Sequence, residues 1–172
     1  MFLSEDSFDY QILNLTPQFY RDYPSPPYNE LIRKNSRPYN CLLLQSHYGY
    51  FICIPYRSHI NHKFAYKFKN SIRSKKVNSG LDYSKIVIIK HSEYISDANA
   101  VIDNDEYKET RDKIEYIKND AQRYIDDYVG CLSGKSAKYS SREFERKYRY
   151  STLKYFHKEL GIPDDNFSIN IQ

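Results

Sequence analysis

The sequence predicts an α+β fold, in which a compact antiparallel β-sheet or small β-barrel core is packed by helices. Short apolar runs bounded by turn residues dominate the first 90 residues, whereas helical periodicity dominates from residue 104 onward. Strands first and helices later, joined by short hairpins, favour this class. A chain of 172 residues buries one core, so we expect residues 1–172 to form a single domain.

The N-terminal part predicts a strand followed by a short helix. The apolar run Tyr10–Leu15 is the strand. Thr16 and Pro17 then form a typical helix start, because proline is tolerated at the first helical position. We therefore expect a helix over residues 18–23, ended by the proline-rich residues 24–27, which form an extended loop.

Two apolar runs, residues 39–45 and 50–55, predict a β-hairpin. The four residues between them end in Gly49, which suits a tight turn. Residues 84–91, rich in Ile and Val, predict a further strand that is buried at its centre. The long basic connection 57–80 alternates aromatic and lysine residues, and its pattern fits either a strand or an irregular loop.

The C-terminal part predicts two long helices. Apolar residues recur at helical spacing over 104–132, and the acidic residues from Asp103 onward are expected to form a solvated face. A loop over 133–138 contains Gly134. A second helix is expected over 141–160, ended by Gly161 and Pro163. Its inward residues are expected to be Phe144, Tyr148, Tyr155 and Phe156.

The charge of the chain is strongly polarised. The net charge is +4, yet the stretch from Arg33 to Lys90 holds twelve Lys and Arg residues and one acid, Asp82. A concentrated positive field of this kind recruits polyanions by releasing their counterions. The 19 tyrosines argue against disorder, and tyrosine also stacks on the bases of single strands, although most of these rings are expected in the core and its rim.

The cysteines and the hydropathy point to a soluble cytoplasmic protein. Three cysteines without a CxxC spacing favour a reducing compartment, and Cys41 and Cys53 fall within apolar strands as core residues. The first residues lack the features of a signal peptide, and no stretch has the length of a membrane span.

The residues Arg57, Ser58 and His59, directly after a strand expected to end at Pro55, are candidates for chemistry on a phosphodiester. Metal-free RNA cleavage needs a base, an acid and cations that offset charge on the phosphorane. His59 or His62 supplies the acid or base, Arg57 and Lys63 supply charge, and Ser58 supplies a hydroxyl. The alternative, which the spacing leaves open, is an ordinary solvated turn.

A zinc site at His59 and His62 is not favoured. No further His, Cys, Asp or Glu follows before Asp82, whereas zinc needs a third or fourth ligand. Metal-dependent nucleases hold their ions with carboxylates, which this segment lacks. We therefore expect no metal and no other cofactor.

The remaining candidates bind RNA or line the same groove. Tyr20 and Arg37 are placed to reach the groove from the short helix and from the residues before the hairpin. The expected RNA-binding residues are Lys34, Asn61, His62, Lys63, Lys67, Lys69, Arg73, Lys75 and Lys76.

The order of these features resembles the ToxN/AbiQ family of endoribonuclease toxins, in particular its CptN branch. The resemblance is carried by residues 16–20 in the short helix, by Arg37, Pro38 and Tyr39 before the hairpin, and by the polar cluster after Pro55. It extends to the last helix, at residues 144–148. It implies a MazF/Kid-like core, metal-independent cleavage that leaves a 2′,3′-cyclic phosphate and a 5′-hydroxyl, and catalytic roles for Tyr20, Arg37 and Ser58.

The resemblance also implies a partner. Toxins of this family cut a tandem-repeat antitoxin RNA, are inhibited by it, and form RNA-bridged cyclic assemblies with it; free toxin cuts messenger RNA. The family often has paired Ser/Thr residues followed by Lys where this chain has Arg57, Ser58 and His59. Two alternatives stay open, namely a non-catalytic RNA-binding module and a MazF-like mRNA interferase with a protein antitoxin.

Overall fold

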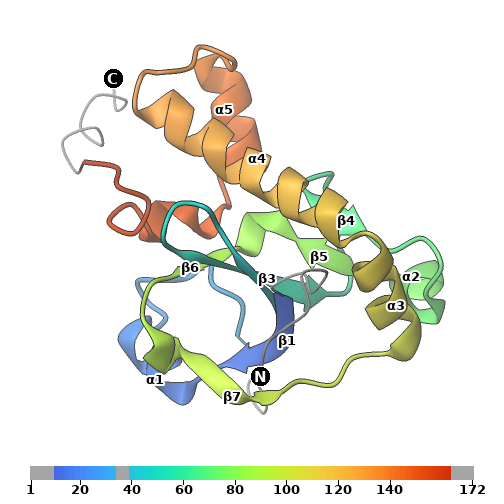
Figure 1. Ribbon diagram of the computed structural model, residues 1–172. Helices are drawn as coiled ribbons and strands as arrows, with labels where there is room; N and C mark the ends of the chain where they lie inside the picture. The colour runs from blue at the N-terminus through green and yellow to red at the C-terminus, as the bar shows by residue number, and fades with distance from the viewer. Residues whose placement is uncertain (1–9, 34–38, 164–172) are drawn as a thin grey trace.

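The computed structural model describes residues 10–33 and 39–163, which form a seven-stranded antiparallel sheet and a set of C-terminal helices (Figure 1). The α+β prediction is confirmed. The strands are β1 (Tyr10–Leu15), β2 (Asn40–Gln45), β3 (Phe51–Arg57), β4 (Ala65–Lys67), β5 (Gly80–Asp82), β6 (Val87–Ile89) and β7 (Ile95–Asn99). The helices are α1 (Pro17–Asp22), α2 (Ile72–Val77), α3 (Asn104–Asp112), α4 (Ile114–Leu132) and α5 (Ser141–Tyr148), with 3₁₀ turns η1 (Tyr83–Lys85), η2 (Ser92–Tyr94) and η3 (Thr152–Tyr155).

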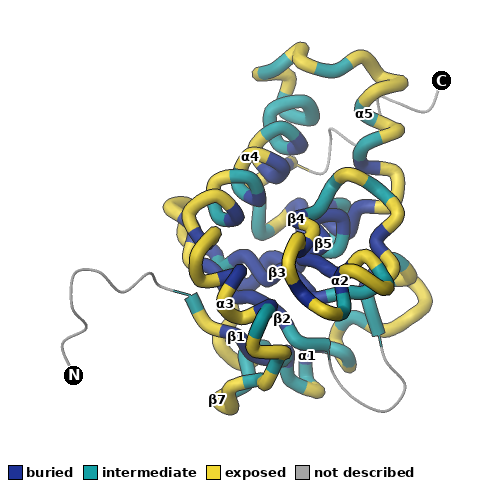
Figure 2. The backbone as a smooth tube through the Cα atoms, turned by 90° about the vertical axis from the view of Figure 1, so that its right-hand side faces the viewer, coloured by how far each residue is buried: buried dark blue, intermediate teal, exposed yellow. Residues whose placement is uncertain are grey.

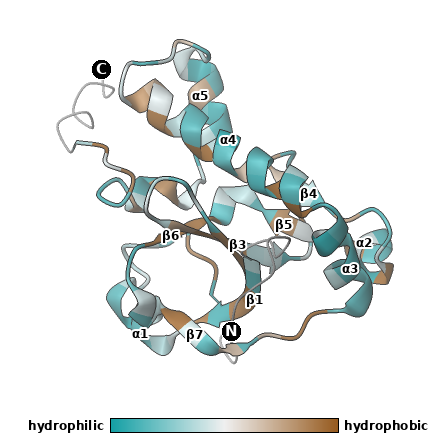
Figure 3. Cartoon of the chain, viewed as in Figure 1, coloured by the Kyte–Doolittle hydropathy of each residue, from teal (hydrophilic) through white to brown (hydrophobic). Residues whose placement is uncertain are grey.

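The sheet is open rather than closed into a barrel. Its strand order is β4-β5-β3-β2-β1-β7, and β6 pairs with β3 beside this path. Within the described part of the chain, β4 and β7 each pair with a single strand, so they form the two ends of the sheet. Strands β2 and β3 are buried at the centre of the molecule (Figure 2), and the apolar colouring of Figure 3 follows the same strands.

The predicted hairpin is confirmed, but its second strand is longer than expected. Leu42 pairs with Ile54, both fully buried, and Gly49 adopts a φ of 76° in the turn. The prediction that this strand ends at Pro55 was wrong, because β3 continues to Arg57. Its last two residues leave β6 and pair with β5 instead, so Arg57 is opposite Gly80 within the sheet.

The basic connection 57–80 contains both a short strand and a helix. Strand β4 covers its alternating part, and α2 starts at the N-cap Ser71, whose hydroxyl accepts from Ser74 N at 2.9 Å. Gly80 is required where β4 approaches β5, because a Cβ there would lie 2.2 Å from the Tyr66 carbonyl oxygen. The sequence pattern of this connection fitted either a strand or an irregular loop, and it did not predict helix α2.

Both predicted C-terminal helices are interrupted. The first breaks at Lys113 (φ −111°, ψ 12°), because α3 directs Glu106 and Thr110 inward while α4 buries an apolar face that starts at Ile114. The second is only α5, with eight residues. After it, Thr152 bonds to the carbonyl oxygen of Ile86, which holds η3 against β6.

Several smaller expectations can be compared with the structure. The loop over 133–138 and Gly161 are confirmed, since Gly134 and Gly161 both have positive φ. Tyr148 and Phe156 are buried as expected, whereas Phe144 and Tyr155 are only half-buried. The strand expected at 84–91 is shorter, because residues 83–85 form a 3₁₀ turn capped by Asp82. No described helix combines the length and the apolar character needed to cross a membrane.

Candidate functional site

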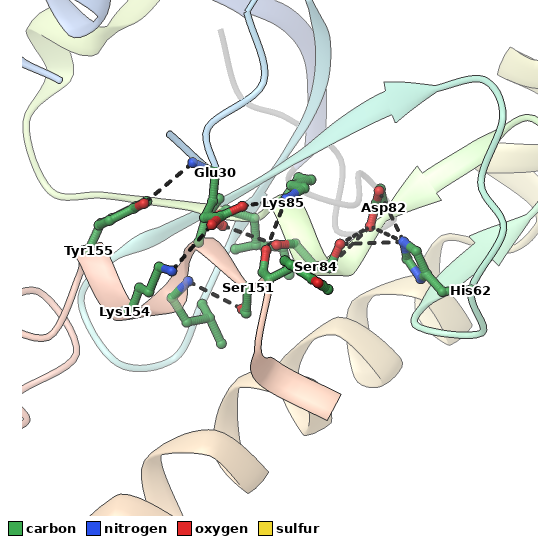
Figure 4. Close-up of polar contacts among 12 residues, drawn as sticks. Glu30, His62, Asp82, Ser84, Lys85, Ser151, Lys154 and Tyr155 are labelled. Carbon is green, nitrogen blue, oxygen red and sulfur yellow. Dashed lines mark hydrogen bonds and ion pairs between the residues drawn. The ribbon is translucent and has the colours of Figure 1, made fainter. Parts of the chain in front are cut away.

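A buried carboxylate, Asp82, organises the polar groups at the end of β3. Its side chain has no exposed surface, and it accepts hydrogen bonds from three residues (Figure 4 shows two of them, His62 and Ser84). Arg57 Nη1 donates to Oδ2 at 2.8 Å, Ser84 Oγ donates to Oδ1 at 2.6 Å, and His62 Nε2 is 3.3 Å from Oδ2. Asp82 thus joins β3, the loop before β4, and η1.

The Asp82 carboxylate is ionised at neutral pH. Burial raises its pKa, but the hydrogen bonds from His62, Ser84 and Arg57 outweigh this effect and hold the pKa below its ordinary value. The resulting fixed negative charge keeps the Arg57 guanidinium in one orientation. Arg57 remains about one-third exposed, at 35%, so its other donors are accessible to an anion.

Both ring nitrogens of His62 have hydrogen-bond partners. The Phe64 backbone N–H donates to Nδ1 at 3.1 Å, so Nδ1 carries no proton and the hydrogen-bond network assigns the proton to Nε2. Nε2 then donates to Asp82. In this arrangement His62 has no free lone pair, and it acts as a positioned donor rather than a base.

Cross-strand pairing places Arg57 and Lys67 on one face of the sheet. Both residues are paired with Gly80, and paired residues of antiparallel strands share a face. Gly80 adds no side chain between them. The neighbouring row, Tyr56 and Leu81, faces the core on the opposite side. Two cations therefore lie on one face of the sheet, on either side of the buried Gly80, and of the two Lys67 is the more exposed.

The turn after Arg57 is rigid and presents His59 to solvent. His59 N donates to the Val77 carbonyl at 2.7 Å, and Ile60 N donates to the Asn78 carbonyl at 3.2 Å. Ile60 is fully buried, and His59 adopts a left-handed φ of 59°. Within the described residues, the side chains of Ser58 and His59 make no hydrogen bond, ion pair or ring contact. The His59 imidazole is therefore available for proton transfer.

The remaining predicted RNA-binding residues differ in whether their side chains are paired with a carboxylate or exposed to solvent. Arg73 is paired with the buried Glu106, which also accepts from Ser79 Oγ at 3.1 Å, so Arg73 is not a free cation. Burial raises the pKa of Glu106 above its ordinary value, against the opposing effect of Arg73. Apart from Arg73 and His62, the predicted RNA-binding residues in the described part of the chain are exposed. They are Asn61, Lys63, Lys67, Lys69, Lys75 and Lys76.

Carboxylates of helix α3 accept hydrogen bonds from the basic segment and hold it against the helix. Glu109 accepts from the backbone N–H groups of Lys69 and Asn70, each at 3.0 Å, and Asp105 accepts from Ile72 N at 2.9 Å. The expectation that the acidic residues of this helix form a solvated face was therefore wrong for Glu106 and Glu109. Glu109 and Asp105 satisfy backbone donors of the segment, whereas Glu106 accepts from the side chains of Arg73 and Ser79.

The structure does not bring Tyr20 together with the Arg57 turn. Tyr20 lies on α1, where its ring packs edge-on against Phe19 at 5.3 Å and the Arg33 guanidinium carbon lies 5.6 Å from the ring centroid. Burial raises the pKa of its hydroxyl well above the ordinary value. Figure 1 shows α1 and α2 at opposite sides of the molecule. Lys34 and Arg37 lie outside the described residues.

Sequence reasoning missed Asp82 and Ser84 as members of the site. The available signal was that Asp82 is the sole acid among twelve cations, which marks it as a partner for one of them. Across residues 10–33 and 39–163, no three His, Cys, Asp or Glu side chains gather in an arrangement that could hold a metal ion.

Comparison of the chain with protein-family models, curated proteins and solved structures finds no match. A functional argument for this protein therefore depends on the geometry and chemistry of its own side chains.

Proposed function

We propose that this protein is a metal-independent endoribonuclease that cleaves RNA at the turn formed by Arg57, Ser58 and His59. The observation that carries the proposal is the Arg57 guanidinium, fixed by the buried Asp82 and followed directly by a rigid turn with an accessible His59. A fixed cation beside a titratable imidazole supplies two of the functions that phosphodiester cleavage requires.

The proposed reaction is an intramolecular transesterification. A base removes the proton of the ribose 2′-hydroxyl, and the oxygen attacks phosphorus to form a 2′,3′-cyclic phosphate. The bond to the 5′-oxygen breaks, and an acid protonates this leaving oxygen to give a 5′-hydroxyl. His59 acts either as the base that removes the first proton or as the acid that supplies the second. Arg57 and Lys67 offset the negative charge on the phosphorane.

In the proposed biological setting the protein is a toxin of a type III toxin–antitoxin system in the bacterial cytoplasm. The resemblance to ToxN/AbiQ toxins supports this setting, together with a MazF/Kid-like core and a catalytic contribution from Arg37. No catalytic contribution is proposed for Tyr20, because its ring packs against Phe19 and Arg33, apart from the Arg57 turn. A repeat antitoxin RNA would bind the exposed lysines of the basic segment, bridge several toxin copies, and block access to messenger RNA.

A non-catalytic RNA-binding module is the second candidate. The observation in its favour is that both ring nitrogens of His62 have hydrogen-bond partners. The Asp82 cluster by itself therefore positions charged groups but offers no unpaired nitrogen that could act as a base. A MazF-like interferase with a protein antitoxin shares the proposed chemistry. Short tandem repeats upstream of the coding region would favour an RNA antitoxin, whereas a small acidic reading frame would favour a protein one.

The test is incubation of the purified protein with RNA in EDTA, followed by analysis of the RNA ends. The cleaved RNA is expected to carry 2′,3′-cyclic phosphate and 5′-hydroxyl ends, and His59→Ala is expected to lose at least about 100-fold in cleavage rate. His47→Ala is the matched control, because His47 is also exposed and lies in the β2–β3 turn. Absence of cleavage, or a His59→Ala variant as active as the parent, would favour the binding module.

A further inference from the structure

An exposed aromatic ring, Tyr150, lies in the short connection between α5 and η3. Tyr150 is 61% exposed, and the Arg149 guanidinium carbon lies over its ring, 5.3 Å from the centroid. Within the described residues, this cation is the only group that the ring contacts in a ring interaction or hydrogen bond. Arg149 is itself exposed and forms no ion pair with a described residue. The ring is therefore accessible to a ligand, with an unneutralised cation beside it.

Buried groups fix the backbone on both sides of Tyr150. Before it, the ring of Tyr148 is buried, and the Tyr148 carbonyl oxygen accepts from Ser151 N at 3.0 Å. After it, Ser151 and Thr152 are buried, and Thr152 Oγ1 donates to the Ser84 carbonyl oxygen at 3.4 Å. Because the backbone is already held in place, binding a ligand on the exposed ring costs little ordering entropy.

Lys85 connects this segment to the candidate site. Its ammonium donates to the Tyr150 carbonyl oxygen at 2.9 Å and lies 3.7 Å from a carboxylate oxygen of Glu30. Figure 4 shows Lys85 between Glu30 and Asp82. Burial lowers the pKa of Lys85, Glu30 and Asp82 raise it, and Arg57 lowers it, so the ammonium lies within electrostatic range of all three groups. Tyr150 is thus held next to the Asp82–Arg57 ion pair.

The combination of an exposed ring with nearby cations matches single-stranded RNA. Such a strand presents phosphates that bind cations, and unpaired bases that stack on tyrosine rings and on arginine guanidinium planes. Arg57 and Arg149 supply exposed guanidinium groups, and Tyr150 supplies the ring. A base stacked on Tyr150 would lie beside the strand position whose phosphate is bound at Arg57.

We propose that Tyr150 is a stacking site for a base of the RNA strand whose phosphate is bound at Arg57, with Arg149 as the cation beside the ring. This inference rests on the proposed RNA-cleaving function for the identity of the ligand. The stacking site itself depends on an exposed ring, a fixed backbone and the nearby Arg57, and it does not depend on His59.

The test uses the absence of tryptophan from the chain, which lets a single substitution report on a single position. Tyr150→Trp is made in a His59→Ala background that leaves RNA uncut. A single-stranded octanucleotide RNA of mixed sequence is expected to quench at least about half of the tryptophan emission, because a base stacks on the indole ring. The matched control is Tyr116→Trp, since Tyr116 is 58% exposed and lies in the first turn of α4. The control is expected to keep its emission.

Inorganic polyphosphate separates stacking from charge. It binds the same cations but has no bases, so it is expected to compete with the RNA and to leave the emission of Tyr150→Trp unchanged. Equal quenching by polyphosphate and by RNA would overturn the proposal. The same holds if fluorescence anisotropy of a labelled RNA shows binding while the emission of Tyr150→Trp does not change.

Affinity gives an independent measurement. In the His59→Ala background, Tyr150→Leu is expected to weaken RNA binding about tenfold, the effect of one lost stacking contact. Tyr150→Phe keeps the ring and is expected to bind RNA as the parent does. Because the Tyr150 side chain is exposed, neither variant is expected to change the unfolding temperature. Equal affinities of the two variants would show that no base stacks on the ring.

Cleavage by the parent separates this inference from the proposed function. Quenching of Tyr150→Trp by RNA, with no cleavage by the parent, would refute the enzyme and keep the stacking site. Cleavage by the parent, with no quenching of Tyr150→Trp, would refute only the stacking site. A protein that neither binds nor cuts RNA would refute both proposals.

Discussion

The Arg57 guanidinium donates to Asp82 Oδ2 at 2.8 Å across strands β3 and β5, and the Asp82 side chain is completely buried beneath it. One carboxylate therefore serves the fold and the candidate site together. It caps η1 through Ser84, and it orients both Arg57 and His62. A change at Asp82 is expected to affect stability and RNA chemistry at the same time.

The Asp82→Asn variant is expected to lose about 2 kcal/mol of unfolding free energy. Removing one partner of a buried ion pair is costly, but Arg57 is one-third exposed and regains water, which reduces the loss. Urea unfolding monitored by circular dichroism measures it, and Asp97→Asn on the exposed part of β7 is the control. An unchanged urea midpoint would show that the Asp82 cluster does not hold the sheet together.

The pH dependence of stability is expected to report the same carboxylate. Because the pKa of Asp82 in the folded protein lies below its unfolded value of about 3.9, its contribution is fully present above that value. It is lost as the pH falls through the folded pKa. The difference in unfolding free energy between the parent and Asp82→Asn should be constant from pH 5 to 7 and shrink below about pH 4. A difference that grows on acidification would contradict the assignment.

The close approach of β4 and β5 predicts a severe effect at Gly80. A methyl group on Gly80 would lie 2.2 Å from the backbone oxygen of Tyr66, which cannot move without opening the strand pair. Gly80→Ala is expected to cost about 3 kcal/mol. Gly49→Ala is the comparison, because Gly49 meets no atom within 4 Å and only its positive φ costs about 1 kcal/mol. Equal urea midpoints for the two variants would refute this account of Gly80.

The exposed lysines of the basic segment predict a salt-dependent contribution to RNA binding. In a His59→Ala background that protects the RNA, replacing Lys67, Lys69 and Lys75 with glutamine is expected to weaken binding of a single-stranded RNA. The slope of log K against log salt should fall by about 2, near 0.7 for each lost phosphate contact. Fluorescence anisotropy at several salt concentrations measures this slope.

The control for the lysine variant removes the same charge elsewhere. Lys108, Lys113 and Lys118 lie on or beside helices α3 and α4, so their triple replacement with glutamine changes the net charge equally. The salt slope of the control is expected to stay close to that of the parent. Equal slopes in both triple variants would show that net charge alone, rather than the basic segment, attracts RNA.

Local sequence patterns were sufficient for the elements whose cause is local. The apolar run Tyr10–Leu15, the hairpin around Gly49 and the left-handed Gly161 follow from side-chain alternation and turn chemistry within a few residues. The charge count likewise marked the basic segment, and a solvated turn was one of the two interpretations left open for residues 57–59.

The tertiary structure decided what depends on partners distant in the chain. Helix α3 separates from α4 because Glu106 and Glu109 turn inward to meet Arg73 and the backbone of Lys69, which are 33 and 40 residues away in the chain. The helical period of a sequence cannot reveal such distant pairs. The same holds for Asp82, whose contact with Arg57 spans 25 residues. The sequence by itself determined where the positive charge lies; only the folded chain decided which cations are neutralised by buried carboxylates and which remain free, because burial makes those pairings obligatory.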